Sequence, residues 1–111
     1  MLRLKKKRES WTHIALTKIT TVLQTQNFKK AVKKLHKNQK SDLDKAVKAL
    51  IEEPLLGEQK KGDLAFLRVF KFKMTKQLTL LGYSYENGAV VLELIALGSH
   101  ENFYRDVKKI F

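Results

Sequence analysis

The stretch of sequence that decides the fold is Ala89–Arg105, AVVLELIALGSHENFYR. Its first part, Ala89–Leu97, is an almost unbroken apolar run that is rich in β-branched side chains and stops at Gly98. A run of this length, bounded by glycines, predicts a strand that is buried on most of its surface. We therefore expect the rest of the chain to be organised around this strand.

A helix is predicted directly after this strand. Ser99 is a favourable N-cap residue, and apolar residues follow it at helical spacing, at Phe103, Val107 and Ile110. His100 then lies in the first turn, at the end of the sheet. A histidine there can take part in chemistry, because a helix N-terminus opposes the protonated imidazole and attracts anions such as phosphate. Position alone favours the plainer interpretation, a surface histidine at a helix start.

Two further β-like runs precede this strand, Phe66–Met74 and Gln77–Tyr85. The first turn is expected at about Thr75-Lys76. The second contains Asn87-Gly88, a dipeptide that strongly favours a tight hairpin. The three runs therefore predict an antiparallel meander, with the strand that begins at Ala89 at or near the centre of the sheet.

The chain before the meander is predicted to hold one short strand and two helices. Thr20–Gln24 favours a strand, and Asn27 is expected to open a helix with an apolar face. That face consists of Phe28, Val32 and Leu35. Its other positions are rich in lysine, which is more often typical of a solvated face than of a binding site.

Ser41 is the expected cap of the second helix. Apolar residues recur at helical spacing from Leu43 to Ile51, the helix ends before Pro54, and Leu55–Asp63 is expected to be a loop. The resulting order predicts an α+β fold: an N-terminal strand, a helical hairpin packed on an antiparallel β-sheet meander, and a short C-terminal helix.

The composition narrows the classes of site that the chain can hold. Its 111 residues are enough for one domain, and 43% apolar residues allow a packed core. Because there is no cysteine, disulfides and thiolate sites are excluded. The three histidines have no spacing typical of metal ligands, so we expect no metal and no cofactor.

The charge is strongly positive, with 23 Lys and Arg residues against 11 Asp and Glu residues, a formal net charge of +12. Such a field attracts polyanions: nucleic acid, an acidic membrane surface or an acidic protein. No apolar run approaches the length of a membrane-spanning helix, and the N-terminus lacks the compact apolar core of a secretory signal. A soluble, cytoplasmic protein is expected.

Residues 1–20 are interpreted as a basic N-terminal extension, and residues 21–111 as the domain. The extension has six basic residues and one acidic residue, without a clean apolar stripe. A loosely held segment is the favoured interpretation; the alternative is an arm that binds RNA or a partner.

Alternation along the first strand of the meander divides its side chains between two faces. Phe70, Phe72 and Met74 are the natural candidates to pack beneath the helices. Lys71 and Lys73 then form a row on the open face. Arg68 stands where the strand begins, where twist or a bulge can present it to either side.

Two segments of the chain resemble the RelE/ParE superfamily of toxins from bacterial type II toxin–antitoxin modules. They are FLRVFKFKMTKQLTLLGYSY (Phe66–Tyr85) and LIALGSHENFYRDVKKI (Leu94–Ile110). With the helical hairpin included, the resemblance runs from about Val22 to Ile110. It implies the fold of that superfamily and a cognate antitoxin partner, which the net charge suggests is acidic.

The most specific part of the resemblance is GSHENFY, Gly98–Tyr104. It is similar to the Gly-x-His-x-x-x-aromatic ending of the YafQ-like branch, in which the histidine acts in mRNA cleavage. The resemblance implies that role for His100 and the role of the aromatic residue for Tyr104. Lys71 follows Arg68 by three residues, a spacing that matches a histidine site of that branch.

The chain departs from two branches of the superfamily at arginine positions. The YafQ-like branch has an arginine on the last strand, where this chain has Ala96, and the RelE branch has one on the middle strand, where this chain has Thr79. Charge on the phosphate would therefore have to be stabilised by other cations, for which we expect Arg68, Lys71 and Lys73. Further RNA contacts are expected from Lys76 and Arg105.

The resemblance implies a toxin that acts as a metal-independent, ribosome-associated mRNA endonuclease, cleaving by attack of the ribose 2′-OH. Its partners would be the acidic antitoxin and mRNA on the ribosome, with no membrane and no small-molecule cofactor. Two alternatives stay open. One is a ParE-like inhibitor of DNA gyrase without nuclease activity, because ParE-like toxins share this fold; the other is a non-catalytic RNA-binding domain.

Overall fold

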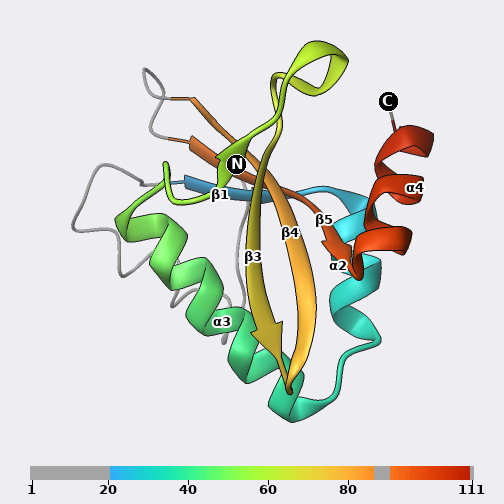
Figure 1. Cartoon of the computed structure of the whole chain (residues 1–111). Coiled ribbons are helices and arrows are strands. Elements are labelled where there is room, and N and C mark those ends of the chain that lie inside the picture. The colour runs from blue at the N-terminus through green and yellow to red at the C-terminus, as the bar shows by residue number, and fades with distance from the viewer. Residues whose placement is uncertain (1–20, 87–90, 111) are drawn as a thin grey trace.

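The computed structural model describes residues 21–86 and 91–110 of the chain (Figure 1). The N-terminal extension and the Asn87-Gly88 turn that the sequence predicts lie outside these ranges. The elements are β1 (Thr21–Gln24), α2 (Gln26–Lys33), α3 (Lys37–Glu52), β2 (Glu58–Gln59), the 3-10 helix η1 (Gly62–Leu64), β3 (Arg68–Met74), β4 (Gln77–Glu86), β5 (Val91–Gly98) and α4 (His100–Ile110). Their order confirms the predicted α+β fold.

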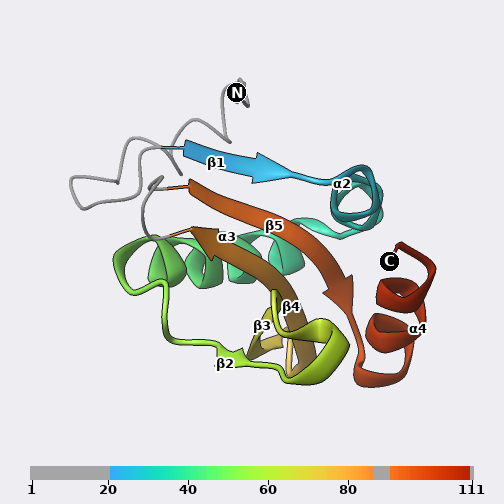
Figure 2. The same cartoon turned by 90° about the horizontal axis from the view of Figure 1, so that it is seen from above.

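In the described ranges, the strands form one sheet with the order β1-β5-β4-β3-β2. β3, β4 and β5 make the predicted antiparallel meander, and β5 has a neighbour on each side. β1 pairs with β5 in parallel, from Thr21 opposite Val91 to Gln24 opposite Leu94, and Figure 2 shows the two strands side by side. The sheet is therefore mixed, a feature that the sequence patterns did not predict.

One face of the sheet is covered by α2 and α3, and a first core fills the space between them. Both predicted helical faces are confirmed, since their apolar residues are buried there, with Leu35 partly buried at the edge. The first core consists of Val22, Phe28, Val32, Leu43, Ala46, Val47, Leu50, Ile51, Met74, Leu81, Tyr83, Leu92, Leu94 and Leu97.

The first helix starts one residue earlier than expected, because Thr25 is its cap. Thr25 Oγ1 accepts a hydrogen bond from the amide of Phe28 at 3.1 Å. The same hydroxyl donates to the carbonyl of Ile95 at 2.6 Å. Thr25 therefore joins the start of α2 to β5, and Asn27 lies inside the helix rather than opening it.

The expected cap of the second helix at Ser41 is wrong. α3 begins after His36, whose amide donates to Oε1 of Gln39 at 2.8 Å. This hydrogen bond satisfies one of the groups left open at the helix start, so the helix extends a full turn before Ser41. The predicted stop is confirmed, since α3 ends at Glu52, before Pro54.

The predicted turn between β3 and β4 is confirmed. Thr75 and Lys76 have φ values of 48° and 73°, and positive φ at both central residues suits the twist of a tight two-residue hairpin. The amide of Thr75 donates to Oδ2 of Asp42 at 2.8 Å, which ties the turn to α3. The end of the hairpin is thus fixed to the helical layer.

The opposite face of the sheet carries α4 and a second core; Figure 1 shows α3 on the left and α4 on the right of the strands. A register shift between Gly82 and Tyr83 leaves Ile95 as an extra residue in β5, so it faces α4 together with Ala96. The second core consists of Leu67, Val69, Leu80, Ile95, Ala96, Phe103 and Val107.

Gly82 provides the close approach that seats α4 on the sheet. A Cβ atom at Gly82 would lie 2.6 Å from Cζ of Phe103 and 3.2 Å from Cδ1 of Leu67. The ring of Phe103 therefore occupies the space that any other side chain at position 82 would need.

In the described part of the chain, no helix has the length and apolar character that crossing a membrane requires.

We expect Gly82→Ala to lower the free energy of unfolding by about 1–3 kcal/mol, because the added methyl group overpacks the second core. Gly98→Ala is the matched control, since its Cβ would meet its nearest neighbour, the amide nitrogen of Phe103, at 3.7 Å. Urea unfolding of both variants measures the difference. Equal stability of the two variants would contradict this role of Gly82.

Candidate functional site

Two lysines of β3 lie exposed on the face that carries α4. Phe70 and Phe72 pack against the first core, as alternation predicts, so Lys71 and Lys73 point to the other side. Lys71 pairs with Leu80, and Leu80 pairs with Gly98. Because neighbouring strands lie about 4.8 Å apart, the backbones of Lys71 and Gly98 are separated by about 10 Å. The lysine row thus runs beside the strand end that leads into α4.

His100 is the first residue of α4 and is exposed. Its ring meets the ring of Tyr104, one helical turn later, with the centroids 5.1 Å apart and an interplanar angle of 62°. Tyr104 in turn packs edge-on against the buried Phe103 at 4.9 Å. Phe103 thereby anchors the two predicted site residues, His100 and Tyr104, to the second core.

Lys60 also belongs to this cluster, although no sequence pattern indicated it. Its Nζ lies 5.7 Å from the centroid of the Tyr104 ring and 3.5 Å from Oε1 of Glu58. A hydrogen bond with Tyr104 raises the pKa of Lys60 above its ordinary value of 10.5, and Glu58 adds to the rise. The ammonium group is therefore positively charged at neutral pH.

Lys60 follows β2, an element within the segment that the sequence predicted to be a loop. Glu58 pairs with Val69, and Gln59 pairs with Arg68, so the edge of the sheet orders this segment. The amide of Lys60 then donates to the carbonyl of Leu67 at 2.9 Å. The backbone of Lys60 is thus fixed on the sheet beside α4.

Arg68 binds the segment before β2 and does not face His100. Its Nε donates to the carbonyl of Gly57 at 3.0 Å, and its Nη2 donates to the carbonyl of Leu55 at 3.1 Å. It pairs across the sheet with Tyr83, a residue of the first core. The structure therefore resolves the choice that strand twist or a bulge left open and places Arg68 on the face of α2 and α3.

Tyr83 holds the same segment from within the first core. Its buried hydroxyl donates to the carbonyl of Pro54 at 2.6 Å and accepts from the amide of Gly57 at 2.9 Å. Burial raises the pKa of Tyr83 above its usual value of 10.0, which keeps the phenol a hydrogen-bond donor. A side chain at Gly57 would collide with that hydroxyl, at 2.7 Å from Cβ.

Lys76 and Arg105, which the sequence predicted as RNA contacts, lie at the margin of this cluster. Lys76 is exposed at the tip of the β3–β4 turn, and Arg105 is exposed on α4, where it donates to Oδ1 of Asn102 at 2.5 Å. Ala96 and Thr79, which the resemblance places at arginine positions of two related branches, are both buried. Ala96 lies beneath α4, and Thr79 faces the first core.

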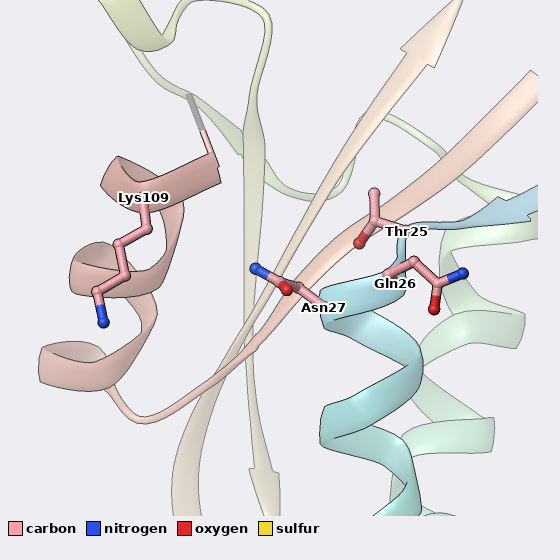
Figure 3. A pocket seen from close by; sticks show the side chains of 4 residues that line it. All are labelled: Thr25, Gln26, Asn27 and Lys109. Carbon is pink, nitrogen blue, oxygen red and sulfur yellow. The ribbon is translucent and has the colours of Figure 1, made fainter.

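A pocket opens at some distance from His100, between the start of α2 and the last turn of α4 (Figure 3). Thr25, Gln26, Asn27 and Lys109 line it. Lys109 lies nine residues after His100, which is about 13 Å along a helix.

Within residues 21–86 and 91–110, no group of three His, Asp or Glu side chains could hold a metal ion.

Comparisons with known proteins identify the family and the fold. Residues 22–108 match the family described as the ParE-like toxin of type II bacterial toxin–antitoxin systems. No curated protein sequence matches the chain.

Solved structures of E. coli RelE share the fold. A free mutant RelE superposes with a TM-score of 0.62 at 20% identity, covering 82% of this chain and 97% of that chain. A chain of the intact E. coli RelBE toxin–antitoxin complex gives a TM-score of 0.60 at 19% identity, covering 71% of this chain and 94% of that chain. The isolated RelE toxin gives 0.58 at 20% identity, covering 82% and 98%. At this level of identity, the likeness establishes the fold alone.

We expect Arg68→Ala to lower the free energy of unfolding by about 1–3 kcal/mol, because two carbonyl groups lose their charged donor. Lys71→Ala is the control: it removes the same charge from the same strand, where the side chain is exposed, and should change stability by less than about 0.5 kcal/mol. Urea unfolding measures both. An unchanged stability of the Arg68 variant would contradict its role in holding the segment.

Proposed function

We propose that this chain, which belongs to the ParE-like toxins of type II bacterial toxin–antitoxin systems, is a metal-independent endoribonuclease that cleaves mRNA on the ribosome. The observation that carries the proposal is the placement of His100 and Tyr104 on the same face of the sheet as the exposed pair Lys71 and Lys73. Because the family belongs to toxin–antitoxin systems, the chain has an antitoxin as partner.

The reaction begins with attack of the ribose 2′-OH on the adjacent phosphorus. The bond to the 5′ oxygen of the next nucleotide breaks, which leaves a 2′,3′-cyclic phosphate on one fragment and a 5′-OH on the other. A base must take the proton of the 2′-OH, an acid must give a proton to the departing oxygen, and cations must stabilise the charged phosphorus centre. All three tasks lie within the chemistry of protein side chains.

The exposed residues of the cluster divide these tasks. His100 transfers a proton, since an imidazole can act as acid or base near neutral pH. Lys71 and Lys73 hold the phosphate, and Tyr104 stacks on a base or orients it. Arg68, which the sequence placed among the catalytic residues, acts on the segment before β2 instead, because the carbonyls of Leu55 and Gly57 occupy its guanidinium.

Binding to the ribosome would rest on the charge of the whole chain. Lys76 and Arg105 lie exposed near the site and can contact phosphates of mRNA or ribosomal RNA. With a net charge of +12, many phosphate contacts are available, and such binding weakens steeply as salt rises. The same charge favours an acidic antitoxin in the cytoplasm, since opposite charge accelerates encounter.

Inhibition of DNA gyrase is the second candidate function. The matching family is named after ParE, and the two arginine positions of the RelE-like branches are filled here by buried Thr79 and Ala96. These replacements remove charge that a nuclease could use. A non-catalytic RNA-binding domain would use the same basic face without proton transfer by His100.

We expect His100→Ala to slow mRNA cleavage by about a hundredfold or more, because the proton transfer is lost. The fold should persist, since the side chain is exposed. His36→Ala is the matched control, as it removes an exposed histidine from the start of another helix. Primer extension on mRNA in a purified translation system measures the rate. Cleavage by the His100→Ala variant at the wild-type rate would contradict the role of His100. If the wild-type protein does not cleave mRNA but inhibits DNA supercoiling by gyrase, the nuclease proposal is wrong.

Lys71→Ala and Lys73→Ala should each slow cleavage at least tenfold, because both lose a cation on the face of His100. Lys29→Ala and Lys33→Ala remove the same charge from α2, on the other face of the sheet, and should have much smaller effects. Rates over a series of salt concentrations test the difference. Equal losses in all four variants would show that only net charge matters.

A further inference from the structure

We infer that Lys60 and Tyr104 form a binding site for a second backbone phosphate of the RNA strand, next to the nucleotide that His100 acts on. This inference rests on the proposed function and adds a ligand contact to the same face of the molecule. It concerns the segment between α3 and β3, which neither the sequence patterns nor the family resemblance brought to the site.

The geometry places a cation beside an aromatic side chain that also touches His100. Tyr104 is 5.7 Å from Nζ of Lys60, measured to the ring centroid, and its ring is 5.1 Å from that of His100. The side chain of Lys60 is 26% exposed, so an anion can reach its ammonium group. Its acidic neighbour, Glu58, is 72% exposed and lies 3.5 Å away, so solvent screens that pair and an RNA phosphate can compete with it.

Lys60 is also held in place before any ligand arrives. Arg68 and Tyr83 bind the carbonyls of Leu55, Gly57 and Pro54, and the amide of Lys60 is bonded to Leu67. Four backbone groups between Pro54 and Lys60 thus find partners on the sheet or in the first core. A cation whose backbone is already ordered loses less entropy on binding than one on a loose loop.

The surroundings favour RNA over an acidic peptide as the ligand. In single-stranded RNA, each base is followed by a phosphate, and proteins bind such strands with aromatic rings for the bases and cations for the backbone. The site places a cation next to aromatic rings in the same way: Tyr104 contacts the ammonium group of Lys60 and the ring of His100. A carboxylate peptide would use the ammonium group but would have no use for the adjoining rings.

Fluorescence anisotropy with a short, labelled 2′-O-methyl RNA tests the site without cleavage, since this RNA lacks the attacking hydroxyl. We expect Lys60→Ala to weaken binding three- to tenfold and to reduce the slope of log K against log salt by about 0.7, the value for one phosphate contact with a single strand. Lys61→Ala, which removes the same charge from the exposed neighbouring residue, should change affinity less than twofold. Lys60→Arg should keep most of the affinity.

An increase in RNA affinity distinguishes a phosphate-binding role of Lys60 from a purely structural one. Glu58→Gln removes the carboxylate that competes for Lys60, so we expect it to tighten RNA binding about twofold or more, which misfolding cannot imitate. Equal losses for Lys60→Ala and Lys61→Ala, no gain for Glu58→Gln, or no binding by the wild-type protein at low salt would overturn the inference. So would Lys60→Ala weakening the binding of poly-glutamate while RNA binding stays unchanged.

The same measurements distinguish this inference from the proposed function. If the wild-type protein binds 2′-O-methyl RNA through Lys60 but does not cleave ribosome-bound mRNA, the phosphate site stands and the nuclease activity fails. If it cleaves mRNA while Lys60→Ala leaves the affinity and the salt slope of RNA binding unchanged, the nuclease activity stands and the phosphate site fails.

Discussion

The packing of Phe103 against Gly82 is the constraint on which the exposed face of the molecule depends. The ring lies where a side chain at position 82 would otherwise be, and it anchors the first turn of α4 to the sheet. His100 lies three residues before Phe103, and Tyr104 lies one residue after it. The contact of Phe103 with the sheet therefore fixes the positions of His100 and Tyr104. The extra residue Ile95 in β5 completes the surface that receives α4.

The two faces of the sheet differ in how far they are covered. The face beneath α2 and α3 holds the larger core, and its polar groups, among them Tyr83 and Arg68, serve to fix the segment after α3. The other face is only partly covered by α4, and β3 presents Lys71 and Lys73 to solvent there. A protein with this charge can therefore bind a polyanion without exposing its main core.

Local patterns predicted the parts of the structure that local interactions determine. Alternation placed Lys71 and Lys73, and the pattern of the meander placed the turn at Thr75-Lys76. The parallel pairing of β1 with β5 and the contact of Lys60 with Tyr104 join residues far apart in the chain, so no local period reports them. The predicted helix cap at Ser41 was wrong because α3 begins one turn earlier, where the amide of His36 binds the side chain of Gln39. The face of the sheet on which Arg68 lies became clear only from the carbonyl groups that it binds.

The most direct measurement of the central claim is the chemistry of the ends that the purified protein leaves on ribosome-bound mRNA. Attack by the 2′-OH leaves a 2′,3′-cyclic phosphate on the upstream fragment and a 5′-OH on the downstream fragment, because no water takes part in breaking the bond. We expect these ends to appear and the downstream fragment to accept a phosphate from polynucleotide kinase without prior dephosphorylation. Fragments that carry a 5′-phosphate, or mRNA that stays intact while cells stop growing, would contradict the claim.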